Sequence, residues 1–479
     1  MHKKKSIHEV EIHDYSVNGD GVSRSLEIPL FIGQSAVGDR LQVEVYDLRK
    51  SFGLAKITKI LDPSPNRDIP FCEYFGECGG CQWQHLSYSE QLKAKKNILV
   101  NSLKFIGGID NIYVNEVIAN KKLINYRNKS QFVVKLNNNK INIGFFKLKS
   151  HELVDLTHCP VAPDLVNSLL ADLKMYLSQF NVSIYNESTH HGLLRHIISQ
   201  YSFYENKILL TLVANAKNIN DIEKKQLGNL YALTEKITQK NTYVIGICLN
   251  FNHAKTNKIL GSSEKNLFGK DYITEKLVSS QTKWSNGKNY LLLEFRSGSF
   301  FQINPYICQE LNDEIYKLAK SYQVKDNELN IIDAYAGIGI ISMWLSGLAK
   351  KIISLEIAKA ACECGLKNLQ LNNINNVSFI NGLVEDNLPR LIKNDNFDLI
   401  ILDPPRKGLD ENIIQAVKKL KIKHIIYVSC NPATLARDLK LFLLADNKAN
   451  NFYKIDKIQP LDMFSHTNHV ETIVGLTCE

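Results

Sequence analysis

The chain has 479 residues, of which 44% are hydrophobic and 22% are charged, and its formal net charge is +9. This length suits two to four domains, and the absence of a long apolar run or of a secretory signal leads us to expect a cytoplasmic protein without a membrane partner. The positive charge favours an anionic partner such as RNA, although many lysine-rich proteins carry a similar charge without binding nucleic acid.

The first 62 residues read as short strands that alternate polar and apolar side chains. His8–Ile12 and Asp39–Tyr46 show this alternation clearly, and a glycine turn at Gly19–Val22 lies between them. Several short strands joined by such turns predict a small β-barrel over residues 1–62. A proline-containing linker at Asp62–Asn66 then ends the first predicted domain.

Four cysteines form a candidate metal site. Cys72, Cys78 and Cys81 lie close together, and Cys159 follows later between a histidine and a proline. Four thiolates in a reducing compartment suit either tetrahedral zinc or an iron–sulfur cluster. Only one tight Cys-x-x-Cys pair is present, which favours a 4Fe-4S cluster over zinc. Ordinary buried thiols remain the third alternative, and that is how we interpret Cys248, Cys308, Cys362, Cys364 and Cys478.

Residues 63–290 are predicted to form a central α+β domain that carries these cysteines. A lysine-rich helix is expected over Tyr88–Phe105, and further helices over 162–177 and 221–238. Strands are expected at 130–135, 141–146, 193–200, 207–214 and 244–250. The lysines of the first helix form either an RNA-binding face or merely a solvated one.

From residue 291 to the end, strands and helices alternate in the order of a doubly wound, Rossmann-like parallel sheet. Three apolar strands end in polar groups: Asp333 with a glycine loop, Asp403 before two prolines and Arg406, and Cys430 before Asn431-Pro432. Because ligands bind at the carboxyl edge of such sheets, we expect these strand ends to form one site. The helix after Cys430 is expected to open near residue 434.

The glycine loop after Asp333 predicts the type of cofactor. It lacks the third glycine of a dinucleotide fingerprint, and an acid, Glu356, ends the next strand. An acid at that position can hold the two hydroxyls of a ribose. A loop without a pyrophosphate cradle but with this acid suits S-adenosylmethionine better than NAD. The Asp403-Pro-Pro motif alone would also suit an amino-methyltransferase, but Arg406 stands where those enzymes carry an aromatic residue.

Taken together, these motifs resemble the RNA uracil-5-methyltransferase family, and within it the branch that modifies 23S ribosomal RNA. The resemblance covers nearly the whole chain, and it likens the N-terminal barrel to an RNA-binding TRAM domain. The segments that carry it are Phe71–His85 with His158–Pro160, Phe300–Asn304, Asp333–Gly339, Asp403–Arg406, Ser429–Pro432 and Phe464–Glu471.

The resemblance implies a role for each site residue. Cys430 is expected to add to C6 of uracil, which makes C5 nucleophilic towards the methyl group, and Glu471 is expected to remove the C5 proton. Arg406 or Arg437 is a candidate for favouring the Cys430 thiolate. The implied cofactor contacts are Gln302, Tyr335, Glu356 and Asp403, and the implied 4Fe-4S ligands are Cys72, Cys78, Cys81 and Cys159.

Three alternatives concern the substrate. The cysteine set favours 23S ribosomal RNA as the partner, since bacterial family members that act on transfer RNA typically lack the cluster. The same reaction on the T-loop of transfer RNA is the second alternative, and a cluster-containing RNA-binding protein without catalysis is the third. The presence of both Cys430 and Glu471 argues against the third. A monomer is expected, and Ser465, where relatives often carry a proline, leaves the shape of that loop open.

Overall fold

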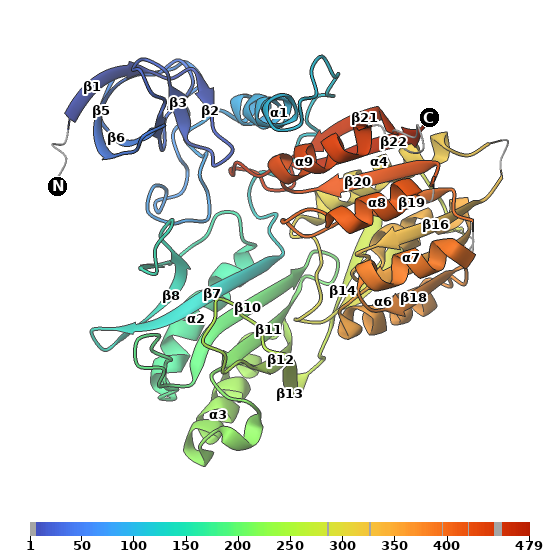
Figure 1. Ribbon diagram of the computed structural model, residues 1–479. Helices are drawn as coiled ribbons and strands as arrows, with labels where there is room; N and C mark the ends of the chain where they lie inside the picture. Colours follow the sequence, from blue (N-terminus) through green and yellow to red (C-terminus); the bar gives the residue numbers. More distant parts are fainter. Residues whose placement is uncertain (1–5, 285–286, 325–326, 395, 420, 445–452) are drawn as a thin grey trace.

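The computed structural model describes residues 6–284, 287–324, 327–394, 396–419, 421–444 and 453–479. Three large sheets follow one another along the chain, and a short helix-bearing segment links the first to the others (Figure 1). None of the helices in these ranges is both long and apolar enough to cross a membrane.

The N-terminal sheet has six strands in the order β1-β5-β6-β4-β3-β2. It curls on itself at one end of the molecule (Figure 1). Its alternating side chains bury Val10, Leu41 and Val43 in a small core of their own. The strands are β1 (Ser6–Glu11), β2 (Asp14–Tyr15), β3 (Gly21–Ser23), β4 (Leu30–Ile32), β5 (Arg40–Leu48) and β6 (Gly53–Asp62).

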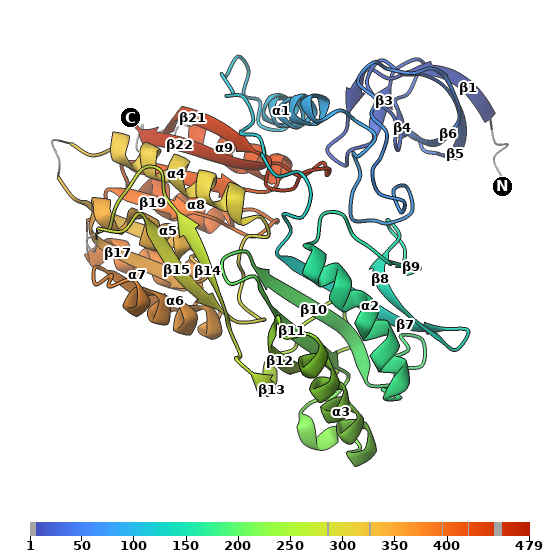
Figure 2. The same ribbon diagram turned by 180° about the vertical axis from the view of Figure 1, so that it is seen from behind.

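The central sheet has seven strands in the order β13-β12-β11-β10-β7-β8-β9. Helices α2 (Asp164–Gln179) and α3 (Lys224–Lys240) share one hydrophobic cluster with the sheet and cover the same face in both views (Figures 1 and 2). The strands are β7 (Lys129–Asn137), β8 (Lys140–Phe146), β9 (Leu153–Asp155), β10 (Leu194–Ser202), β11 (Lys207–Ala214), β12 (Val244–Phe251) and β13 (Ser263–Gly269). The expected strands and helices of this region are all present.

Helix α1 (Tyr88–Phe105) has the predicted bounds, but it packs on the C-terminal part of the chain. Its buried Leu99 and Leu103 join the cluster that includes Leu435 of α9 (Pro432–Leu443). Figure 1 shows α1 lying along the edge of the C-terminal sheet. The interpretation of its lysines as surface residues is wrong for Lys95, which is fully buried.

The C-terminal sheet has seven strands in the order β18-β17-β16-β19-β20-β22-β21. The first five strands are parallel, as predicted. A short loop joins β21 to β22, and β22 pairs antiparallel with both β21 and β20. The strands are β16 (Leu329–Ala334), β17 (Ala349–Glu356), β18 (Val377–Asn381), β19 (Leu399–Leu402), β20 (His424–Ser429), β21 (Tyr453–Leu461) and β22 (Glu471–Cys478).

Alternate residues along the parallel strands pack against different helices. Ile331 faces a cluster that includes α4, α5 and α6, whereas its neighbour Ile332 faces one that includes α7, α8 and α9. The helices are α4 (Pro305–Ser321), α5 (Ile340–Leu345), α6 (Lys359–Leu371), α7 (Val384–Asn394) and α8 (Glu411–Lys419). A hairpin of β14 (Ile273–Val278) and β15 (Tyr290–Phe295) spans the expected boundary at residue 290 and packs with the first of these clusters.

Candidate active site

The predicted strand ends meet at one edge of the C-terminal sheet. Ala334 of β16 pairs with Leu402 of β19, which pairs in turn with Tyr427 of β20, so the residues that follow each strand leave the same edge. These include Tyr335 and Asp403. The structure thus brings together the acids and the thiol that the sequence placed at strand ends.

Cys430 and Glu471 face each other across two antiparallel strands. Ser429, the last residue of β20, pairs with Thr472 near the start of β22. Antiparallel pairing then places Cys430, the residue after β20, opposite Glu471, the first residue of β22. The thiol and the carboxylate therefore lie at one end of this strand pair.

The turn after Cys430 is held by Asn431. Its side chain accepts a hydrogen bond from the backbone N–H of Ala433 at 3.1 Å and caps α9, which begins at Pro432, two residues earlier than expected. A proline at the first helical position is favourable because its missing N–H has no partner there. The Asn431 amide also donates to the carbonyl of Arg406 at 3.0 Å. This bond holds the Asp403–Arg406 loop against the turn that follows Cys430.

The pKa of Cys430 is raised to about 11, chiefly by burial. The negative charges of Glu471 and Asp403 contribute to this rise, whereas the guanidinium of Arg406 opposes it. Arg437, the other candidate, bonds instead to Asp438 and to the carbonyls of Lys407 and Leu409. Of the two arginines considered from the sequence, Arg406 is therefore the one beside Cys430.

Two carboxyl groups, the buried Glu471 and the half-buried Asp403, act on the thiol. Burial raises the pKa of Glu471 well above its usual range, with Asp403 adding to the effect and Arg406 opposing it. Burial, together with the charge of Asp333, raises the pKa of Asp403 to about 7. Asp403 thus interacts electrostatically both with the Cys430 and Glu471 pair and with Asp333 on the next strand.

A cavity beside these groups collects most of the predicted cofactor residues. Gln302, Tyr335 and Asp403 line it together with the glycine loop after β16. Two buried side-chain oxygens in its wall, Asp333 Oδ1 and Asn312 Oδ1, have no hydrogen-bond partner. Because buried polar atoms are normally paired, these acceptors fit a ligand that brings donors or positive charge, as S-adenosylmethionine does.

Glu356 does not line this cavity directly. Its carboxylate accepts hydrogen bonds from the N–H groups of Gly337 at 2.9 Å and Ala358 at 2.7 Å, which ties it to the glycine loop. Tyr335 begins that loop with a φ of 65°, a left-handed conformation that is uncommon for a bulky side chain. Its hydroxyl donates to Glu385 at 3.2 Å. Asp333 was not among the predicted contacts, although its place at the end of an apolar strand is the same signal that identified Asp403.

The four clustered cysteines line a second cavity, in the central part of the molecule. Cys72, Cys78, Cys81 and Cys159 all contribute to its wall. Burial raises the pKa of each thiol, to about 11 for Cys78 and about 12 for Cys81. Across the described ranges, no group of three or more His, Cys, Asp or Glu side chains is arranged to hold a single metal ion.

The loop between β21 and β22 connects the cysteine segment with Glu471. The backbone N–H groups of Gln82 and Trp83 both donate to the carbonyl of His466 at 3.0 Å. The His466 ring bonds to Gln91 and to the carbonyl of Leu123, and burial lowers its pKa. These contacts make His466 a structural residue.

The same loop is anchored beneath by a buried ion pair. Lys95 of α1 bonds to Asp462, which also accepts hydrogen bonds from Tyr88 and Ser465. The Ser465 side chain thus fixes the shape of the loop that the sequence had left open. Lys95 was missed because a lysine within a lysine-rich helix gives no signal of burial.

Comparison with known proteins identifies the family. A family model described as tRNA (uracil-5-)-methyltransferase matches residues 87–478. An uncharacterized RNA methyltransferase of Clostridium tetani is 36% identical over 476 residues, which cover 99% of this chain and 97% of that protein. A similarly named protein of Bacillus cereus is 32% identical over 473 residues, covering 98% and 96%.

Among solved structures, the chain resembles the Pyrococcus abyssi tRNA (uracil-54, C5)-methyltransferase in complex with S-adenosyl-L-homocysteine. The TM-score is 0.73 at 26% identity, and the alignment covers 98% of this chain and all of that one. The similarity thus extends across all three sheets and the cofactor cavity. The chain belongs to the RNA (uracil-5-)-methyltransferase family and is an S-adenosylmethionine-dependent enzyme that methylates C5 of uracil in RNA.

Proposed function

We propose that this enzyme forms 5-methyluridine in 23S ribosomal RNA, with Cys430 as the nucleophile and Glu471 as the base. The observation that carries the catalytic assignment is the pairing of β20 with β22, which sets the half-buried thiol opposite the buried carboxyl group. The choice of ribosomal RNA rests on the four-cysteine set, which resembles that of the ribosomal branch of the family.

In the proposed reaction, the Cys430 sulfur bonds to C6 of uracil, and the ring electrons move to C5 as an enolate. S-Adenosylmethionine, when bound, would supply the methyl group that C5 takes up, and would leave as S-adenosylhomocysteine. Glu471 then takes the proton from C5, and the returning electrons expel the thiolate from C6. Arg406 interacts with both Cys430 and Glu471 and lowers the pKa of each, so it favours the charged form that each needs in its own step.

We further propose that Gln302, Tyr335, Glu356 and Asp403 hold the cofactor. Glu356 would hold the ribose from the end of β17, while the other three line the cavity itself. Asp333 is buried at this cavity, and Asp403 is half-buried in its wall. Their negative charge, once ionised, complements the positive charges of S-adenosylmethionine.

For the second cavity we propose a 4Fe-4S cluster on Cys72, Cys78, Cys81 and Cys159. Its support is that these four thiols line one cavity and that only one tight Cys-x-x-Cys pair is present, which favours a cluster over zinc. We also propose three domains: an RNA-binding barrel over 1–62, a cluster domain over 63–290 and a catalytic domain over 291–479. We propose that the enzyme is a monomer.

The substrate is tested with RNA from a strain that lacks this protein. Ribosomal and transfer RNA are separated and digested, and 5-methyluridine is quantified in each by mass spectrometry. We expect 5-methyluridine to be lost from 23S RNA and restored by the wild-type gene, but not by Cys430→Ala. An unchanged 23S RNA would contradict the proposed substrate.

The T-loop of transfer RNA remains the second candidate substrate, and one observation favours it. The Pyrococcus abyssi enzyme, which matches this chain over nearly its full length, is named for uracil-54 of transfer RNA. Loss of 5-methyluridine from transfer RNA alone in the same experiment would assign this chain to that substrate and would remove the argument from the cysteines.

The catalytic roles are tested with Glu471→Gln. Without a base the C5 proton stays in place, so the thiolate is not eliminated and the enzyme remains bonded to methylated RNA. We expect a band of protein linked to RNA on a denaturing gel for Glu471→Gln, and none for Cys430→Ala or for the double variant. A linked band that persists in Cys430→Ala would exclude Cys430 as the nucleophile.

The cluster is tested by metal analysis of protein purified without oxygen. We expect about four iron atoms and about four sulfides per chain, and loss of both in Cys78→Ser. About one zinc ion and no sulfide would contradict the cluster in favour of zinc.

A further inference from the structure

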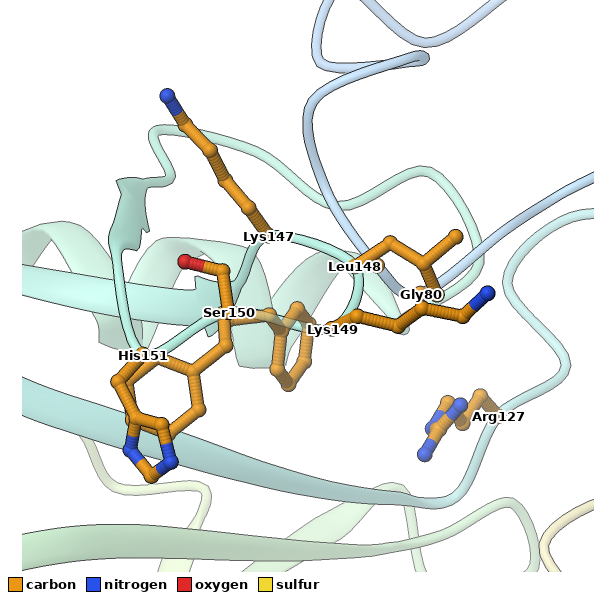
Figure 3. Close-up of a pocket in the computed structure, with 10 residues that line it drawn as sticks. Gly80, Arg127, Lys147, Leu148, Lys149, Ser150 and His151 are labelled. Carbon is orange, nitrogen blue, oxygen red and sulfur yellow. The ribbon is translucent and has the colours of Figure 1, made fainter. Parts of the chain in front are cut away.

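A hollow next to the cysteine segment has the chemistry of a site for the RNA backbone. Its walls are Gly79 and Gly80 of that segment, Arg127, and the turn Lys147–His151 between β8 and β9. Figure 3 shows Lys149 extending over this hollow on the same side as Arg127 and Gly80, whereas Lys147 points away from them.

The turn that carries the lysines is fixed to the cysteine segment. Cys78 and Lys147 form an antiparallel bridge, and the N–H of Gly79 donates to the carbonyl of Phe146 at 3.0 Å. A Cβ at Gly79 would lie 2.9 Å from that carbonyl oxygen and 3.2 Å from the nitrogen of Leu148. Only glycine allows this close approach, so the hollow is a preformed feature and not a gap between two loose loops.

Of the two cations of the hollow, Lys149 is exposed, and Arg127 also lines the cavity of the four cysteines. Neither Arg127 nor Lys149 forms an ion pair with any residue that the structure describes, and the Arg127 Nε donates to the carbonyl of Lys129. The charge of Lys149 acts on Asp20, whose pKa it lowers against the larger effect of burial. Lys147 differs, because its ammonium lies 2.8 Å from Glu152 and 3.9 Å from Glu77.

The chain beside the hollow continues to the cavity that holds Gln302 and Asp403. Asn128, the residue after Arg127, donates from its side chain to the carbonyl of Gln302 at 3.0 Å and from its backbone N–H to the carbonyl of Ile303 at 2.9 Å. Gln302 and Asp403 line one cavity. A nucleic acid strand whose base enters the active site can therefore pass by Arg127.

We propose that Arg127 and Lys149 bind consecutive phosphate groups of the substrate RNA strand next to the target uridine. This proposal rests on RNA methylation being the function of the chain. Two unpaired cations in a rigid hollow suit the phosphate backbone, since phosphate contacts give affinity and position without reading sequence. The cysteine segment then has a role in binding, because it holds the turn on which Lys149 stands.

The test measures RNA affinity against salt for the full chain and four variants. The probes are an unmodified 23S transcript and a fluorescent single-stranded oligouridylate, with potassium chloride varied from about 0.05 to 0.4 M. Each lost phosphate contact on a single strand lowers the salt slope by about 0.7, which corresponds to about fivefold weaker binding at 0.1 M salt. We expect this change for Lys149→Ala and for Arg127→Ala.

Lys147→Ala is the matched control, because it removes the same charge from the same turn but from a lysine that is already paired. We expect it to keep the wild-type slope. Wild-type slopes for Lys149→Ala and Lys149→Glu would overturn the proposal, as would an equal loss in Lys147→Ala. Lys149 is exposed, so its variants decide the matter even when Arg127→Ala does not fold.

The outcomes separate this proposal from the function on which it rests. A wild-type chain that binds both probes through Lys149 but forms no 5-methyluridine in the transcript would contradict ribosomal RNA as the substrate and support the phosphate site. A wild-type chain that methylates the transcript while Lys149→Ala binds it equally well would support the function and contradict the site.

Discussion

At the scale of single residues, the reactivity of Cys430 depends on two neighbours of opposite sign. Its pKa is about 11 in the free protein, so the thiol is protonated at neutral pH. Arg406 lowers this pKa, whereas Glu471 raises it. We therefore expect Arg406→Ala to slow alkylation of Cys430 by iodoacetamide at pH 8, and Glu471→Gln to accelerate it, each by about three- to tenfold.

The measurement follows the Cys430 peptide by mass spectrometry over pH 7–9, where the rate should rise about tenfold per pH unit because the thiolate fraction does. The buried Cys308 in the same samples is an internal control for unfolding. Equal rates in Arg406→Ala and Glu471→Gln would contradict the assigned electrostatic roles.

Residues at strand ends were the most predictable part of the site. Asp403 and Cys430 each follow an apolar run, and the edge of a parallel sheet brings such positions together whatever the rest of the chain does. The choice between Arg406 and Arg437 was not predictable, because it depends on Asp438 binding Arg437 from the next position in the helix. That pairing is set by side-chain packing and not by sequence spacing.

At the scale of elements, the loop Asp462–Val470 is held from below by α1. Lys95 and Asp462 are both fully buried, and the ammonium also donates to the carbonyl of Phe464 at 2.9 Å. Removing one member of a buried pair leaves the other charge without a partner. We expect Lys95→Met to lower the free energy of unfolding by about 3 kcal/mol.

Lys96, the next residue, provides the matched control. It pairs with Glu116, whose side chain is 84% exposed, so Lys96→Met should cost less than about 1 kcal/mol. Urea denaturation of the full chain measures both values. Because the loop leads to Glu471, Lys95→Met should also reduce the rate of methylation more than it reduces RNA affinity. Equal stability of the two variants would show that the buried pair contributes no more than a surface one.

The secondary structure of these elements was largely predictable, whereas their partners were not. The bounds of α1 follow from its hydrophobic period and from Ser87, which accepts a hydrogen bond from Glu90 as the helix cap. That α1 packs against α9, more than 300 residues further along the chain, is a long-range contact that local propensity does not encode. The same limit applies to β22, whose position between β20 and β21 depends on the loop that precedes it.

At the scale of the whole molecule, three parts of the chain meet at the loop Asp462–Val470. Asn468 donates to the carbonyl of Val17 in the barrel at 2.8 Å, and Trp83 of the cysteine segment donates to Gly19 at 2.9 Å. His466 joins the same group through Gln82 and Trp83. The N-terminal sheet region and the cysteine segment are thus both tied to the loop that leads into β22, the strand that begins with Glu471.

The buried carboxyl groups of the cofactor cavity give the whole molecule a defined pH dependence. The pKa of Asp333 and of Asp403 is about 7 in the folded protein, against 3.8 for an ordinary Asp. Between these values the folded state holds protons that the unfolded state has released, so stability is greatest at low pH and is lost as pH rises through 7. Each carboxyl group contributes a slope of about 1.4 kcal/mol per pH unit near pH 5–6.

Calorimetry of the cofactor-free protein should therefore show a melting temperature that falls from pH 5 to pH 7.5, and Asp403→Asn should flatten this fall by its own share. Asp386→Asn, which removes an exposed carboxyl group, serves as the control and should leave the curve unchanged. Parallel curves for wild type and Asp403→Asn would mean that Asp403 is already ionised in the folded protein, ready for a positively charged cofactor without any loss of a proton.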